Sequence, residues 1–160
     1  MPNYHIHSHC CFTPSERPYI YSVDMMKAYV NLFRHPIVKI NVDEFLPQLK
    51  ENLWGDFSPM DVLKNPHKKE YAAHYKRIMN AELSYPLFVS GEHNIIDGAH
   101  RLCKAILTDK KTVNAYVFNK TLMKKFVMHE GFTADNKIDE AGADKKELYE
   151  VLMLFHKRFC

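Results

Sequence analysis

The residues of this chain best suited to chemistry form one continuous segment, Ile95-Ile96-Asp97-Gly98-Ala99-His100-Arg101. A hydrophobic run typical of a buried strand leads to a carboxylate, and the glycine that follows allows a sharp turn. We expect a helix to begin directly after this glycine. The first N–H groups of a helix have no partner within it, and its dipole attracts an anion. The segment therefore predicts a strand, a turn and a helix that together bind phosphate.

The side chains around this turn add groups that a phosphate site needs. Arg101 offers a planar fork of N–H donors, and His100 can donate a hydrogen bond or move a proton. Asp97 can hold Mg²⁺ or take a proton. The backbone amides expected to hold the phosphates are those of Gly98, Ala99 and His100. A purely structural interpretation stays open, with Asp97 as a helix cap and Arg101 as the partner of Glu92 or another acidic residue.

The elements that must position this segment lie between residues 85 and 118. Pro86–Ser90 and Asn94–Asp97 predict the two strands of a hairpin. A helix is expected from Gly98 to about Thr108, and Val113–Phe118 predicts a further strand.

The rest of the sequence predicts more strands and helices. The expected strands are 18–22 and Ile37–Val42. The expected helices are 23–33 after a Ser22 cap, 43–54 ended by Gly55, one starting at Ser58-Pro59, one from Asn65-Pro66 to Leu83, 121–129 and 145–159. We expect an irregular arm over 1–16, a loop over 133–144, and a single α+β domain over 17–160 with a small mixed sheet packed against helices.

The segment Asp97-Gly98-Ala99-His100-Arg101 resembles the D-G-x-H-R motif of the ParB/sulfiredoxin-like superfamily. The hairpin, helix and strand of 85–118 are similar to that family's motif region, and Ile37–Val42 with the following helix is similar to its first strand and helix. The resemblance covers about residues 37–118. It implies a nucleotide such as ATP, ADP or CTP, with Mg²⁺, and a G-x-H-R-type turn on the phosphates.

The resemblance also separates the activities known in that superfamily. Sulfiredoxins carry a catalytic cysteine where this chain has Ala99, and Cys103, one helical turn later, is a poor substitute. Partition ParB proteins have G-E-R-R at the turn and additional DNA-binding and dimerisation regions, for which this chain is too short. The serine kinases of the superfamily use an acidic base near the first strand, a place that Asp43, Glu44 or Glu51 could fill.

Several functions therefore stay open. The first is a Mg²⁺-dependent phosphotransferase or nucleotide hydrolase, with Asp97, His100 and Arg101 catalytic and with Glu92 and Asp43 as secondary candidates for metal ligand or base. The second is a non-catalytic module that binds a nucleotide or DNA. The third is a ParB-like nuclease or accessory protein acting on DNA, and the fourth is a scaffold for protein partners.

The composition is that of a globular protein with a formal net charge of +3, from 22 Lys and Arg against 19 Asp and Glu. This charge is too small to imply a nucleic-acid partner. No apolar run approaches the roughly 18 residues of a membrane span, and the start lacks a signal-peptide pattern. We expect an intracellular, cytoplasmic protein without a membrane partner. Its cysteines form no C-x-x-C pair and are expected to be reduced: Cys10, Cys11, Cys103 and Cys160.

Other side chains receive structural interpretations. Trp54, Tyr85 and Phe88 are expected in the core rather than as platforms for base stacking. The closing helix over 145–159 could cover the sheet or form a homodimer contact. The histidines of His5-Ile6-His7-Ser8-His9 are expected on the surface. Two basic sets are expected on solvated helix faces, or, if their helices flank the 97–101 turn, as groups that raise the affinity for a polyanion. The first set is Lys64, His67, Lys68, Lys69, His74, Lys76 and Arg77, and the second is Lys104, Lys110 and Lys111.

Overall fold

The chain forms two compact units, Pro36–Val117 and a second unit made of Met1–His35 with Phe118–Cys160. The structure is a computed structural model. It describes residues 8–11, 19–130 and 153–160, with side chains over 21–127 and 153–160. The predicted domain over 17–160 takes in both units.

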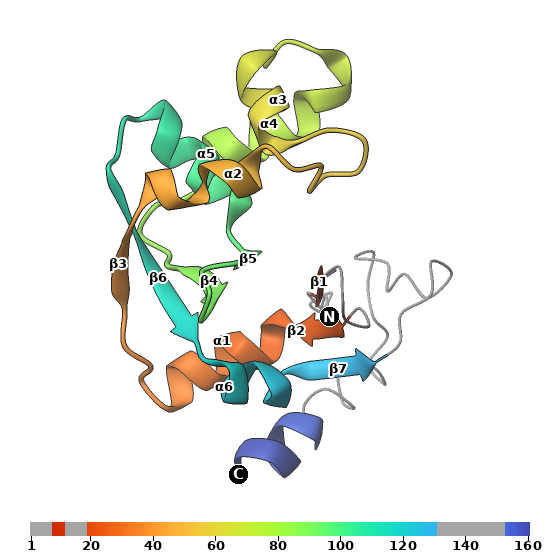
Figure 1. The fold of residues 1–160 in the computed structure, drawn as a ribbon, viewed down its shortest axis with the longest axis vertical. Helices are drawn as coiled ribbons and strands as arrows, with labels where there is room; N and C mark the ends of the chain where they lie inside the picture. The colour runs from red at the N-terminus through yellow and green to blue at the C-terminus, as the bar shows by residue number, and fades with distance from the viewer. Residues whose placement is uncertain (1–7, 12–18, 131–152) are drawn as a thin grey trace, which may run out of the picture. The chain divides into compact units, whose positions relative to one another are not determined.

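The unit Pro36–Val117 is built around a four-stranded sheet (Figure 1). Its strands, in spatial order, are β3 (Val38–Asn41), β6 (Thr112–Phe118), β4 (Leu87–Ser90) and β5 (Ile95–Asp97). β3 runs antiparallel to β6, with Val38 opposite Ala115. β4 and β5 form the antiparallel hairpin that the sequence predicts, with Phe88 opposite Asp97.

The helices of this unit gather beyond one end of the sheet (Figure 1). They are η1 (Val42–Phe45), α2 (Leu46–Leu49), α3 (Pro59–Lys64), η2 (Lys69–Tyr71), α4 (Ala72–Asn80) and α5 (Ala99–Leu107). α3 begins with a capping box, in which the Ser58 hydroxyl accepts from the Asp61 N–H at 3.0 Å and the Asp61 carboxylate accepts from the Ser58 N–H at 2.9 Å. α5 packs against both α3 and α4.

The core of this unit is an apolar cluster shared by the sheet and the helices. Phe45, Leu49, Ile78 and Leu102 each expose 0% of their surface, and Leu87 of β4 exposes 1%. Burying such side chains contributes about 1.5–3 kcal/mol each. This burial holds the β5–α5 turn on a rigid base.

The second unit contains a three-stranded antiparallel sheet in the order β1 (Ser8–Cys11), β2 (Tyr19–Ser22), β7 (Val127–Glu130). Its helices are α1 (Val23–Leu32), α6 (Lys120–Lys125) and a helix over 153–159. The Ser22 hydroxyl caps α1 by accepting from the Met25 N–H at 3.1 Å. Ring contacts join its aromatic side chains: Tyr29, Phe33, Phe118, Phe126, Phe155 and Phe159.

The α+β fold, the small sheet packed against helices and the elements around residue 98 confirm the sequence predictions. The helix predicted over 43–54 is wrong in length: it is a 3-10 turn followed by α2, and it ends at Leu49. Its next apolar residue, Leu53, is 41% exposed, so its burial does not hold a further turn of this helix. The helix predicted from Pro66 begins later, because Lys68 is extended and no side chain from 66 to 70 is buried.

Two predicted non-strand regions form strands. Ser8–Cys11 lies in the expected irregular arm and pairs with β2, and Val127–Glu130 replaces the second half of the helix predicted over 121–129. The pairing of β7 with β2 joins segments about a hundred residues apart, which local patterns do not show. The rest of the arm, the loop predicted over 133–144 and most of the predicted closing helix lie outside the described residues. No helix in the described ranges is long and apolar enough to cross a membrane.

Candidate functional site

The turn between β5 and α5 requires a glycine. Gly98 has φ +120°, a conformation that L-residues rarely adopt, and it is buried. A Cβ atom there would overlap the Leu87 side chain and lie 3.4 Å from the guanidinium of Arg101. The backbone therefore enters α5 through a space that only a glycine fits.

The N-terminus of α5 has no cap within the part of the chain that the structure describes. The first intrahelical bond of this region runs from the Leu102 N–H to the Gly98 carbonyl at 3.0 Å. Gly98 offers no side chain, and no described residue accepts from the N–H groups of Ala99, His100 or Arg101. These three donors, at the positive end of the helix dipole, are available to an anion.

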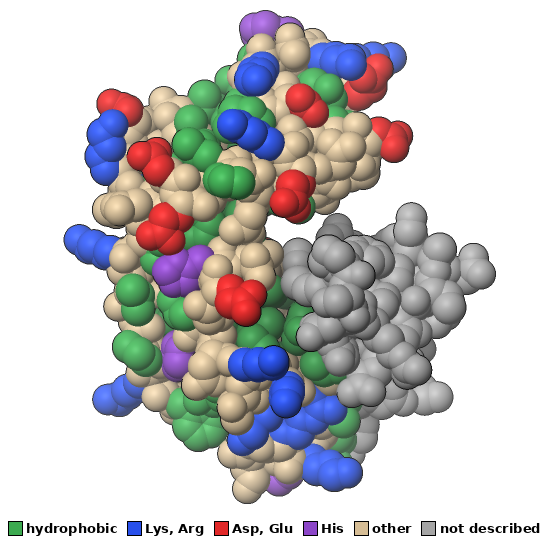
Figure 2. Space-filling view, viewed as in Figure 1, with side chains coloured by type: hydrophobic (Ala, Val, Ile, Leu, Met, Phe, Trp, Pro, Cys, Tyr) green, Lys and Arg blue, Asp and Glu red, His purple; other side chains and the backbone are tan. Residues whose placement is uncertain are grey.

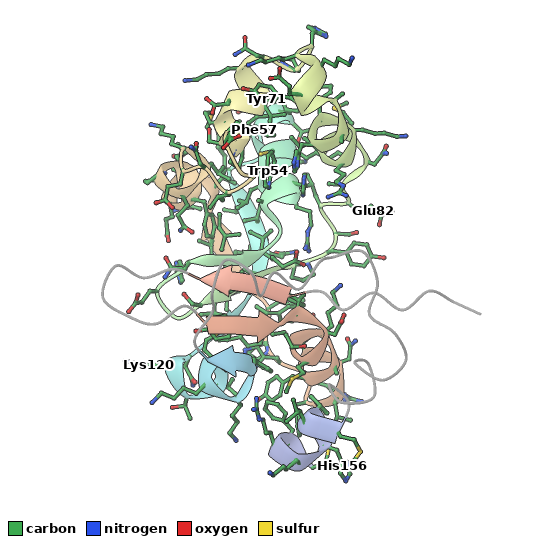
Figure 3. All side chains as sticks on the ribbon, turned by 90° about the vertical axis from the view of Figure 1, so that its right-hand side faces the viewer. Trp54, Phe57, Tyr71, Glu82, Lys120 and His156 are labelled. Atoms are coloured by element: carbon green, nitrogen blue, oxygen red, sulfur yellow. The ribbon has the colours of Figure 1, made fainter. Side chains whose placement is uncertain are left out.

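A pocket of about 410 Å³ opens over this helix end. It lies between α5 and the segment that follows α4, and the side chain of Glu82 on that segment is labelled in Figure 3. The volume is within the range of small-molecule sites. The lining residues are Arg77, Asn80, Ala81, Glu82, Tyr85, Asp97, Gly98, His100 and Arg101.

The Arg101 guanidinium is largely engaged by the protein. Its Nη1 donates to the carbonyls of Tyr85 and Pro86 at 3.3 and 2.6 Å, and its Nη2 donates to Oδ2 of Asp97 at 2.9 Å. The Arg101 side chain is only 18% exposed. Arg101 thus ties α5 to the chain entering β4, and its partner is Asp97, not Glu92. The charges that the sequence assigns to phosphate and Mg²⁺ compensate one another in this structure.

Arg77 supplies the second guanidinium of the pocket, and this one has no partner among the described residues. It lies near the end of α4, is exposed, and makes no hydrogen bond or ion pair with a described residue. The sequence placed it in a set of basic side chains that would favour a polyanion if their helix flanks the turn. Those residues are spread over α3, η2 and α4 and the turns between them, not along one helix.

His100 lies against a neighbouring histidine and a tryptophan. Its Nε2 is 3.0 Å from Nδ1 of His74, so one of these two nitrogens carries the proton and donates it in a hydrogen bond to the other. The Trp54 ring stacks on both, with centroids 4.2 Å from His74 and 4.5 Å from His100. Burial, and then the nearby His74 and Arg77, lower the pKa of His100 to about 4. His100 is therefore neutral at pH 7 and adds no positive charge to the pocket.

Trp54 belongs to a column of aromatic rings that supports this histidine pair. Figure 3 shows Trp54, Phe57 and Tyr71 one above another in the helical part of the unit. Phe57 contacts Tyr71 with ring centroids 4.5 Å apart and meets His74 edge-on at 5.5 Å. The expectation that Trp54 packs in the core is met in part, because it is half-buried against the apolar cluster.

The secondary candidates do not line the pocket. Glu44 accepts from Nδ1 of His93 at 2.8 Å, on the turn of the β4–β5 hairpin. Gln48 supports the same hairpin, donating to the His93 carbonyl and accepting from the Ile95 N–H, both at 2.8 Å. Glu92 lies in that exposed turn and Asp43 lies exposed in η1.

The described residues do not fit a protein-held Mg²⁺. They contain no group of three or more His, Cys, Asp or Glu side chains that could hold a metal ion. Oδ2 of Asp97 is occupied by Arg101, and Glu92 is not part of the pocket lining. Burial raises the pKa of Cys103 to about 12, so this thiol is an inert core group.

Tyr85 and Lys104 have roles that the sequence did not indicate. Tyr85, expected in the core, is 63% exposed and lines the pocket, whereas Phe88 is buried as predicted. The Lys104 ammonium donates to the carbonyls of Met79 and Ala81 at 3.0 and 2.5 Å. It satisfies the last carbonyls of α4 and fixes the start of the segment that borders the pocket.

Comparison with protein-family models, with curated proteins and with solved structures finds no match for this chain.

Proposed function

We propose that this chain binds the phosphate groups of a nucleotide at the N-terminus of α5. The observation that carries the proposal is the combination of three uncapped N–H groups, at Ala99, His100 and Arg101, with the unpaired Arg77 in one pocket. Helix N-termini and guanidinium groups are both suited to phosphate oxygens. The D-G-x-H-R sequence at this turn supports a fold of the ParB/sulfiredoxin-like type.

The charges of the pocket favour a ligand with a polyanionic end and a neutral end. Arg101 and Asp97 compensate one another at 2.9 Å. Arg77 and the helix dipole are left as the positive groups, and Glu82 is left as the negative one. A bare polyphosphate would meet Glu82 unfavourably if it filled the whole pocket. A nucleotide such as ATP, ADP or CTP can keep its phosphates near the helix.

Binding is better supported than turnover. Asp97, the predicted catalytic carboxylate, is held in an ion pair with Arg101, and the described residues hold no metal-binding cluster. In this proposal Mg²⁺ arrives with the nucleotide as part of the substrate, as it commonly does in phosphoryl-transfer sites. A non-catalytic nucleotide-binding module is therefore better supported than the phosphotransferase or hydrolase expected from the sequence, which remains the second candidate. An intracellular location, as expected from the sequence, would suit either.

DNA is a weaker candidate ligand. On the face shown in Figure 2, acidic and basic side chains are interspersed over the helical part of the unit Pro36–Val117. Binding of a duplex backbone relies on several Lys and Arg contacts on one surface. A ParB-like nuclease acting on DNA gains no support from the face that Figure 2 shows. The predicted homodimer contact lies largely outside the described residues.

A thermal-shift screen tests the proposal. ATP, ADP, CTP and GTP are added to the wild type and to Arg77→Gln, each with and without Mg²⁺. A ligand that binds only the folded state at a hundredfold excess over its Kd stabilises it by about 2.7 kcal/mol. We expect a nucleotide-dependent rise in Tm in the wild type that is reduced in Arg77→Gln. An unchanged Tm with every nucleotide would refute the proposal, and release of phosphate over hours would establish turnover.

A further inference from the structure

We propose that Tyr85 is the stacking surface for the base of the bound nucleotide, with Glu82 accepting hydrogen bonds from the nucleoside. The inference rests on the proposed phosphate site at the N-terminus of α5. It makes the ligand a nucleotide rather than a free polyphosphate, and it gives the pocket a phosphate end at Gly98–Arg101 and a nucleoside end at residues 82–85.

Tyr85 has an aromatic ring that the protein leaves uncovered inside a pocket. Its relative exposure is 63%, and its side chain makes no hydrogen bond or ring contact with a described residue. Most large aromatic side chains of this unit are packed, as Phe88 at 5% exposure shows. A nucleobase placed on an exposed ring gains about 1–3 kcal/mol from stacking.

The backbone that carries Tyr85 is held in place from several directions. The Tyr85 N–H donates to the Glu82 carbonyl at 3.2 Å, which closes a turn over residues 82–85. Arg101 binds the carbonyls of Tyr85 and Pro86, and Lys104 binds the carbonyl of Ala81. Two side chains of α5 therefore fix both ends of the turn. The ring is presented from an ordered backbone, which reduces the entropy lost on binding.

Glu82 determines which end of a nucleotide fits next to Tyr85. Its side chain, labelled in Figure 3, is exposed and belongs to the pocket lining. An ionised carboxylate only accepts hydrogen bonds, and a phosphate group at neutral pH offers mainly acceptors. Ribose hydroxyls and the exocyclic amino groups of bases are donors. The nucleoside is thus the part of the ligand that suits Glu82, and Asn80 on the same lining can donate or accept.

Calorimetric titrations with tripolyphosphate, ATP and CTP separate this inference from the phosphate site on which it rests. The proteins are the wild type, Tyr85→Ala and Tyr85→Phe. Both substitutions keep the Tyr85 carbonyl that accepts from Arg101, so the fold around the turn is retained, and Tm measurements check this.

We expect Tyr85→Ala to weaken binding of the preferred nucleotide about five- to hundredfold, from the loss of stacking. Its affinity for tripolyphosphate should equal that of the wild type, and Tyr85→Phe should bind nucleotide normally. Equal nucleotide affinity in Tyr85→Ala and the wild type would overturn the role of Tyr85 while leaving the phosphate site intact. Absence of binding of tripolyphosphate and of both nucleotides to the wild type would overturn the phosphate site itself, and the inference with it.

Discussion

Substitution of Gly98 by alanine adds one carbon atom to the β5–α5 turn and tests whether only a glycine fits there. The added Cβ has two separate costs. The first is backbone strain, because φ is +120°, and this costs about 1–3 kcal/mol for a residue with a side chain. The second is a steric overlap with Leu87, which is 1% exposed and packed in the core. Overpacking of this kind costs about 1–3 kcal/mol. We expect Gly98→Ala to lower the free energy of unfolding by about 2–6 kcal/mol.

Gly55 provides a matched control. It also has a positive φ, +92°, but an added Cβ there would have no atom within 4 Å. Gly55→Ala therefore measures backbone strain without overlap, and Gly98→Ala should cost about 1–3 kcal/mol more. The overlap can also be removed by shortening the side chain that the added Cβ would meet, Leu87. In a Leu87→Ala background the space beside Gly98 is empty, so the second substitution should cost only about as much as Gly55→Ala.

Urea unfolding followed by the fluorescence of Trp54 is a suitable assay. Trp54 is the single tryptophan of the chain and stacks within the same unit as Gly98. Neighbouring residues in contact show coupling energies of about 0.5–3 kcal/mol in double-mutant cycles. Equal destabilisation by Gly98→Ala and Gly55→Ala would refute the overlap. The overlap would also be refuted if the free-energy changes of Gly98→Ala and Leu87→Ala add within about 0.5 kcal/mol in the double variant.

Two further predictions concern stability. The pKa of His100 is about 4 in the folded protein, against the ordinary value of 6.5 that applies in the unfolded chain. Between these two pH values the unfolded chain therefore binds more protons than the folded protein. Stability should therefore fall by at most about 3 kcal/mol as the pH is lowered from 6.5 to 4, and urea unfolding of His100→Gln should show a flatter pH dependence. Ser58→Ala removes the hydroxyl of the α3 capping box and should cost about 1 kcal/mol in the same assay, whereas Ser58→Thr should retain most of it. A loss below about 0.3 kcal/mol in Ser58→Ala would show that the cap is dispensable.

Local signals made the β5–α5 turn predictable. A glycine between a hydrophobic run and a helical pattern indicates a sharp turn, because glycine adopts conformations that other residues disfavour, and the turn between two apolar strands indicates the hairpin. The Asp97–Arg101 ion pair was also within reach of the sequence, because the two residues are four positions apart. The sequence analysis instead assigned Asp97 to Mg²⁺ and Arg101 to phosphate, because each side chain alone suits that ligand.

Tertiary contacts decided the rest of the site. Arg77 and Tyr85 border the pocket only because α4 packs against α5 and because Arg101 and Lys104 hold the segment between α4 and β4. No periodicity in the sequence encodes that proximity. The same is true of Trp54, which meets two histidines from different helices. β7 was mistaken for helix because its pairing with β2 spans about a hundred residues.

Calorimetric titration of tripolyphosphate into the wild type, Arg77→Gln and Lys76→Gln tests the phosphate site most directly. Lys76 is the neighbour of Arg77 on α4, is also exposed and does not line the pocket, so both variants lose one positive charge. A hydrogen bond to a charged group contributes about 1.5–3 kcal/mol, which corresponds to a weakening of at least tenfold. We expect Arg77→Gln to lose about that much affinity and Lys76→Gln to bind within about twofold of the wild type. Equal affinities in the two variants, or no binding to the wild type, would contradict a phosphate site at the N-terminus of α5.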